Sequence, residues 1–231
     1  SVMFAGATLV ALGLLSIGLS LSGETRPLSR PELSDPLTEL AHRACGRSVA
    51  VREWTPSSET GAAAVVTGVG RAGKVLLSSE MVRDWAEDEI AVVVAHELSH
   101  HAHHDLARKA AVDAGLWCVT LGLADRVIAI WGPALGVHSA TDLAALPLLA
   151  LAAGGIWCLL RPVRLSQSRA HERRADHFAL ALTGSSEAFA RALRRLSEAH
   201  LAEERPSRLT RWFFHRHPTV EERLAVSARR R

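Results

Sequence analysis

The stretch His96-Glu97-Leu98-Ser99-His100 places two imidazoles and a carboxylate within five residues. On a helix, residues i and i+4 lie on one face, so His96 and His100 can present ring nitrogens to a single ion. Neutral imidazoles suit Zn²⁺, and Glu97 is close enough to take a proton from a zinc-bound water. His104, one turn further on, could extend this set, although we expect a solvated or packing role for it. The pentapeptide therefore predicts a hydrolytic zinc site that needs a third ligand.

A carboxylate further along the chain can supply that ligand. The apolar spacing of residues 168–182 predicts a helix on which Glu172 and Asp176 lie one turn apart. One of them can bind the metal while the other orients a metal-binding histidine. The simpler alternative is that both acids are solvated and pair with neighbouring arginines, and residue types alone favour it.

Four motifs together resemble a known family. The His-Glu-x-x-His at residues 96–100 is followed by Ser-Arg-x-x-Glu-x-x-Ala-Asp at 168–176. A glycine-turn strand precedes them at 68–81, and a His-Pro-x-x-x-x-Arg-Leu segment follows at 217–224. Over about residues 36–226, this order is similar to that of the membrane zinc endopeptidases that include the CAAX prenyl proteases and the bacterial heat-shock protease HtpX. The chain departs from their pattern at 61–64, where Gly-Ala-Ala-Ala replaces a more polar stretch.

The resemblance implies a fold and a set of site residues. The fold would be mainly α with a small antiparallel β-sheet, that is, a zincin-like metalloprotease domain with transmembrane helices. One Zn²⁺ per chain would be bound. The implied zinc ligands are His96, His100 and Glu172, the base is Glu97, the orienting carboxylate is Asp176, and the residue that stabilises the transition state is His217.

Three apolar stretches are candidate membrane spans, at residues 2–21, 114–137 and 143–160. The first and third carry no charge and approach the ~20 residues that a spanning helix needs. The second contains Asp125 and Arg126, each of which costs about 2.5–3.5 kcal/mol at mid-bilayer unless paired, so a partly inserted hairpin is an alternative there. We expect residues 1–22 to form a transmembrane segment and not a signal peptide, because a basic start and a cleavage site are missing. Further residues are expected upstream of Ser1.

The placement of basic residues predicts the orientation. They follow the first apolar stretch, precede the second and follow the third, whereas the connection at 138–142 carries none. By the positive-inside rule, residues 36–110 and 165–228 form a cytoplasmic metallopeptidase domain at the inner membrane, interrupted by a membrane hairpin at 111–162. The basic flanks are Arg26 and Arg30, Arg108 and Lys109, and Arg161, Arg164 and Arg169.

Composition agrees with a membrane-anchored domain. Hydrophobic residues make up 48% of the 231, and the net charge is +3. The basic residues are scattered and lack interleaved aromatics, which argues against nucleic acid as a partner. Three cysteines, two of them in apolar stretches, suggest no disulfide framework. Lysine occurs only at Lys74 and Lys109 among 27 basic residues, a bias typical of GC-rich bacterial genes.

Local patterns predict the remaining elements. Residues 21–36 are expected to be a polar tether, with Asp35 as the N-cap of a helix over 36–45. Thr219-Val-Glu-Glu222 is a capping box and starts a final helix. Further helices are expected over 88–110 and 187–204, and short strands over 48–54, 62–69 and 74–78.

These features predict a membrane-anchored zinc metalloendopeptidase that hydrolyses membrane or misfolded proteins, as in protein quality control. Its substrate would bind in extended form along the edge of the sheet near residues 62–69, and its other partner would be the lipid bilayer. One alternative is a receptor-type sensor peptidase, which would need an extracytoplasmic sensor domain. The other is a catalytically silent membrane adaptor. The complete set of ligands, base and His217 argues against the adaptor, because a scaffold has no need of them.

Overall fold

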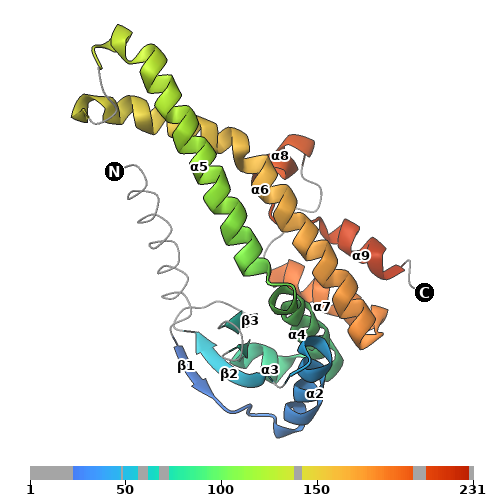
Figure 1. Ribbon diagram of the computed structural model, residues 1–231. Coiled ribbons are helices and arrows are strands. Elements are labelled where there is room, and N and C mark those ends of the chain that lie inside the picture. The colour runs from blue at the N-terminus through green and yellow to red at the C-terminus, as the bar shows by residue number, and fades with distance from the viewer. Residues whose placement is uncertain are drawn as a thin grey trace.

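The computed structural model describes residues 23–47, 49–56, 62–67, 73–137, 142–199 and 207–228. A four-stranded sheet and its covering helices form the body, and a long pair of helices, α5 and α6, projects from it (Figure 1). The predicted transmembrane segment at 1–22 lies outside the described residues. The expected class, mainly helical with a small sheet, is confirmed.

The sheet is mixed and not wholly antiparallel as expected. Its strand order is β1 (Gly23–Arg26), β2 (Ala50–Pro56), β4 (Lys74–Ser78) and β3 (Ala64–Thr67). The pairs β1–β2 and β3–β4 are antiparallel, whereas β2 and β4 are parallel. The chain passes from β2 to the outer strand β3 before it reaches β4, so the β3–β4 hairpin brings β4 back parallel to β2.

Strand β1 occupies part of the segment expected to be a tether. The Arg26 guanidinium donates from Nε to Glu53 Oε1 over 3.1 Å, and the Ser29 N–H donates to Oε2 over 2.7 Å. Burial alone would raise the pKa of Glu53, but these hydrogen bonds outweigh it and lower the pKa to about 2. A buried carboxylate on β2 thus holds β1 at the sheet edge.

The core lies between the sheet and the helices around it. Helix α2 (Ser34–Cys45) follows the short 3-10 turn η1 (Pro31–Leu33), and α3 (Ser79–Asp84) leads into α4 (Glu87–Ala102). Because α2 begins at Ser34, Asp35 lies in its first turn and is not the predicted N-cap. The fully buried side chains that join these elements include Leu37, Leu77, Met81, Ile90 and Leu98.

The helix expected over residues 88–110 is broken in two. Helix α4 ends at Ala102, and His104 adopts a left-handed conformation with φ 54° before α5 (Asp105–Trp131) begins. His103 stabilises the end of α4 at this break. Its N–H donates to the Ser99 carbonyl over 3.0 Å, and its ring Nδ1 lies 2.8 Å from the same oxygen. The break redirects the chain from the core into the hairpin.

The hairpin consists of α5, two 3-10 turns, η3 (Pro133–Leu135) and η4 (Leu143–Ala145), and α6 (Leu146–Thr183). Helix α6 continues through Pro162, so the third apolar stretch and the segment carrying Glu172 are one helix. Both arms are long and apolar enough to cross a membrane by length and composition. Only 17% and 6% of their most apolar windows is buried, which distinguishes them from the core helices of a soluble protein.

Three helices complete the described chain: α7 (Ser186–Ala199), α8 (Arg208–Phe214) and α9 (Val220–Ala228). The predicted capping box at the start of α9 is confirmed, because the Thr219 N–H donates to Glu222 Oε2 and the Glu222 N–H donates to Thr219 Oγ1, each over 3.2 Å. Helix α7 occupies the described part of the helix expected over 187–204, whereas α8 was not predicted.

Candidate metal centre

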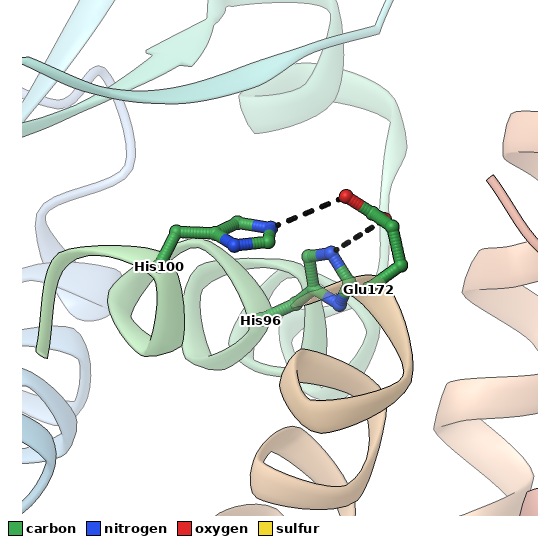
Figure 2. A group of neighbouring side chains, drawn as sticks. All are labelled: His96, His100 and Glu172. Atoms are coloured by element: carbon green, nitrogen blue, oxygen red, sulfur yellow. Dashed lines mark ion pairs between the residues drawn. The ribbon is translucent and has the colours of Figure 1, made fainter. Parts of the chain in front are cut away.

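Two histidines of α4 and one glutamate of α6 point toward one another (Figure 2). His96 Nε2 lies 3.4 Å from Glu172 Oε2, and His100 Nε2 lies 3.5 Å from Glu172 Oε1. One donor atom from each of the three residues falls within 4.8 Å of the others. The structure therefore brings together the three residues expected to bind zinc, although Glu172 lies more than 70 residues beyond both histidines in the sequence.

The spacing of these donors fits a shared cation. Ligand atoms held 2.0–2.1 Å from one ion at tetrahedral angles lie ~3.4 Å apart, which matches both separations. Nitrogen and oxygen joined by a hydrogen bond usually lie about 2.7–3.2 Å apart. Two imidazoles and a carboxylate are also the donor set that hydrolytic zinc sites use when they keep a fourth position for water.

The outer nitrogen of each histidine meets its own carboxylate. His96 Nδ1 lies 3.1 Å from Asp176 Oδ1, and His100 Nδ1 lies 2.9 Å from Asp105 Oδ2. A carboxylate on one ring nitrogen fixes the tautomer and leaves the lone pair of the other nitrogen for a metal. Both rings therefore direct Nε2 toward Glu172.

Asp176 is itself fixed by an arginine of α9. Arg223 donates from Nε and Nη2 to the two carboxylate oxygens of Asp176, over 2.8 and 2.6 Å. Burial raises the pKa of Asp176, but the contacts with His96 and Arg223 outweigh it and hold the pKa below its usual value. Burial lowers the pKa of His96, and the carboxylates of Asp176 and Glu172 reverse the effect and raise it to about 9. The orienting role predicted for Asp176 agrees with this geometry.

Asp105 is a site residue that the sequence motifs missed. It directly follows the left-handed residue His104, so its side chain turns back toward His100 and does not follow α4. Arg174 of α6 donates to its other oxygen, Oδ1. The helix break places this carboxylate near the candidate ligands, and nothing in the His-Glu-x-x-His pattern indicates that break.

Asp105→Asn is expected to weaken zinc binding by about 10–100-fold, because an amide cannot hold the His100 ring as a charged acceptor does. The measurement is a zinc dissociation constant obtained by competition with a chromophoric chelator. Asp113→Asn is a matched control, since Asp113 lies on the same helix and pairs with Arg164. Equal zinc affinities for the two variants would contradict the orienting role.

Glu97 faces the same space as the three candidate ligands. It lines a cavity of about 790 Å³ together with His96, His100 and Glu172. Burial raises the pKa of Glu97 above its ordinary value, and the negative Glu172 adds to the increase, while His96 and His100 oppose it. A carboxyl with a raised pKa suits proton transfer near neutral pH.

Apolar side chains and a sheet edge form another part of the cavity wall. Val93 of α4 and Phe189 and Leu193 of α7 line one part, and residues 62–64 at the start of β3 line another. The Ala63 N–H donates to Ser78 Oγ over 2.9 Å, which ties this segment to β4. Among the described strands, none pairs with the outer edge of β3.

His217 lies at the mouth of the cavity, on the segment between α8 and α9. Its Nδ1 lies 2.9 Å from Glu172 Oε2, and its side chain is 63% exposed. Two arginines fix this segment at its ends: Arg169 of α6 donates to the His215 carbonyl over 2.9 Å, and Arg223 binds Asp176. The structure thus places His217 beside the candidate ligands.

The histidines that follow His100, at the end of α4 and in the break after it, point to other surroundings. The His103 ring packs edge-on against Phe178 at 5.7 Å, and His101 contacts Arg47. His104 is exposed at the helix break. Among the described residues, only His96, His100 and Glu172 form a group with the spacing of metal ligands.

Known proteins are similar to this chain in fold and in sequence. The crystal structure of S. mikatae Ste24p matches with a TM-score of 0.72 and 20% identity, over 96% of this chain and 55% of that one. The uncharacterized metalloprotease YhfN of Bacillus subtilis (strain 168) is 29% identical over 203 residues, which are 86% of this chain and 48% of that protein. The chain therefore spans about half the length of these relatives. The model of Peptidase family M48 matches residues 27–230, nearly the whole chain, and the chain therefore belongs to peptidase family M48.

Proposed function

We propose that the protein is a membrane-anchored zinc metalloendopeptidase. The observation that carries this proposal is the pair of carboxylate-oriented histidines, His96 and His100, whose inner nitrogens lie 3.4 and 3.5 Å from the oxygens of Glu172. Family membership supports it, and so does the position of Glu97 beside the three ligands. The silent-adaptor alternative gains no support from a site in which ligands, orienting carboxylates and base all converge.

When bound by these three residues, a zinc ion would polarise the scissile carbonyl and lower the pKa of a water molecule. Glu97 accepts a proton from the attacking water and later delivers it to the leaving amine. His217, with its exposed ring over the cavity, donates a hydrogen bond to the oxygen of the former carbonyl as charge develops there. Asp176 and Asp105 keep the two histidines aligned throughout.

The substrate binds as an extended segment along β3. The outer edge of this strand offers main-chain donors and acceptors, and residues 62–64 lead from it into the cavity. Phe189 and Leu193 give the cavity an apolar wall, which favours an apolar substrate side chain beside the scissile bond. Membrane or misfolded proteins expose such segments, which fits a role in quality control.

Cleavage of an unfolded protein by the purified, reconstituted chain tests the proposal. We expect cleavage of reduced, unfolded casein that stops on addition of a zinc chelator and returns with Zn²⁺. Comparing the protein N-termini of cells that carry the parent protein or an inactive Glu97 variant would then identify natural substrates. Binding of unfolded protein without any metal-dependent cleavage would favour the adaptor.

His217→Ala is expected to lower kcat by about 10²–10³-fold, with zinc content and KM little changed. This is the pattern for loss of a contact that forms chiefly in the transition state. Steady-state kinetics and metal analysis on one preparation provide both readouts, and His177→Ala, at an exposed histidine of α6 that does not line the cavity, is the control. Loss of zinc would make His217 a ligand and reopen the assignment of Glu172, while full activity would remove it from the mechanism.

The membrane part of the proposal has its own test. A cysteine at Ser139, between the two arms and outside the described residues, should react with a membrane-impermeant thiol reagent added to intact cells. A cysteine at Ala225, exposed on α9, should react only after lysis. Both are introduced into a chain in which Cys45, Cys118 and Cys158 are alanine. Labelling at Ser139 only after lysis would show that the hairpin does not cross the bilayer.

A further inference from the structure

Exposed large apolar side chains occur at two places in the described part of the chain. Most lie on the α5–α6 hairpin, between Leu106 and Val163. The others all lie on α8, where Leu209, Trp212 and Phe214 are 74%, 58% and 64% exposed. A seven-residue helix that keeps three such side chains out of the core presents an apolar surface that needs a partner.

Helix α8 lies beside α6 (Figure 1), and the contact described next places it near the end of the uncharged stretch 143–160. The Arg161 guanidinium, first after that stretch, lies over the Phe214 ring with its Cζ 5.0 Å from the centroid. Arg169, two turns further along α6, donates to the main-chain carbonyls of Arg211 and His215, over 3.2 and 2.9 Å. The apolar surface of α8 is therefore held next to the apolar hairpin, at its boundary with the charged part of α6.

The charge around α8 indicates which partner it fits. Arg161, Arg208 and Arg216 are exposed near its two ends, while Arg211 pairs with Glu222. Tryptophan and phenylalanine next to arginine are characteristic of segments that lie in the membrane–water interface and contact anionic headgroups. Continuity with the hairpin favours the bilayer surface over a protein partner, because the same bilayer would cover both apolar surfaces.

We propose that α8 is embedded in the membrane–water interface and sets the height of the metal centre above an anionic bilayer. The chain runs from α8 directly into the cavity wall, since Phe214 and the residues up to Pro218 line it. Along α6, the rise from Arg161 to Glu172 is ~16 Å, at about 1.5 Å per residue. An extended substrate covers that distance with about five residues.

A substrate class follows, and this step rests on the proposed function. Membrane-anchored polypeptides are cut in the segment just outside the bilayer, and the scissile bond must lie at least about five residues beyond the apolar span. Peptide bonds closer to the span cannot reach Glu97 and the ligands, because the position of α8 in the interface holds the cavity at a fixed height above the bilayer.

Spin labels test the position of α8 without any need for activity. Single cysteines at Leu209 and Trp212, in the full chain without its native cysteines, carry a nitroxide in vesicles of phosphatidylcholine and phosphatidylglycerol. A label at Ala225, exposed on α9, is the matched control. We expect labels at 209 and 212 to relax more with oxygen, which partitions into lipid, and the label at 225 to relax more with a water-soluble nickel chelate.

Two results would overturn the proposal. Labels at 209 and 212 that behave like the label at 225 would place α8 in water. Labels shielded from both relaxation agents would mean that a protein surface, such as a second copy of the chain, covers α8. Either result leaves the proposed peptidase function untouched.

Cleavage measurements test the consequence for substrates. The double variant Leu209→Ser/Trp212→Ser should lower kcat/KM for a substrate tethered by one membrane span on the order of tenfold, because the cavity loses its fixed height. A soluble peptide with the same cleavage sequence should be cut at the parental rate. In the parent, shortening the spacer of the tethered substrate below about five residues should abolish cleavage.

An equal loss of kcat/KM on tethered and soluble substrates would show that the double substitution acts by disturbing the fold. Cleavage by the parent that does not depend on spacer length would contradict the fixed height of the cavity. Failure of the parent to cut either substrate would instead count against the peptidase function. The spin-label result is independent of that outcome.

Discussion

Glu97→Gln is expected to lower kcat/KM for peptide cleavage by about 10²–10⁴-fold, the range that a general base supplies. The amide has the shape of the carboxylate but cannot accept the proton of the attacking water. Zinc content and thermal stability should change little, because Glu97 belongs to neither the ligand set nor the orienting carboxylates.

Kinetics and metal analysis on the same reconstituted sample measure both properties. Glu87→Gln is the matched control, since it makes the same change in the first turn of the same helix, where Glu87 pairs with Arg30 at the surface. Residual activity of Glu97→Gln within about tenfold of the parent would rule out the general-base role. Loss of zinc would assign Glu97 to the ligand set.

The parts of the site that the sequence predicted depend on local spacing. His96 and His100 share a helix face because they are one turn apart, and the same argument relates Glu172 to Asp176. The capping box before α9 is also a local pattern, and it appears in the structure as expected. Patterns of this kind can be predicted from the sequence because their geometry is set by a few consecutive residues.

The parts that were missed depend on contacts between distant residues. Strand β1 exists because Arg26 and Ser29 reach a buried carboxylate, Glu53, on the next strand, and no run of apolar alternation marks it. The parallel pairing of β2 with β4 follows from the position of β3 outside them. Such pairings are decided by the tertiary structure, so propensity alone cannot predict them.

The helix break at His104 affects the chemistry most among these differences. A continuous helix would carry Asp105 away from His100. The left-handed conformation of the residue before it instead places Asp105 Oδ2 2.9 Å from His100 Nδ1. A histidine with positive φ is uncommon, and its cost is offset by the hydrogen bonds that His103 makes to Ser99. Uncommon backbone conformations are concentrated at functional sites, which agrees with the position of this one.

Glu172→Ala is expected to abolish stoichiometric zinc binding, and cleavage with it. Alanine leaves only His96 and His100, and a change in an outer partner alone usually costs 10–100-fold in metal affinity, so loss of a ligand should cost more. The parent should contain about one zinc per chain by elemental analysis. His104→Ala is the control, because His104 lies four residues after His100 in the sequence but outside the candidate ligand group. Full zinc retention by Glu172→Ala, with loss only in His104→Ala, would overturn the assignment.

Thermal unfolding gives a second readout that does not depend on activity. An ion that binds only the folded state raises Tm, so a chelator should lower the Tm of the parent and of His104→Ala. The same chelator should leave the Tm of Glu172→Ala unchanged, because there is no bound metal to remove. Glu172→His separates the ligand role from a purely structural one, since an imidazole can replace a carboxylate as third ligand. Partial recovery of zinc and of chelator sensitivity in Glu172→His is therefore expected, whereas a Glu172 that served only as an ion-pair partner of His96 would give no recovery.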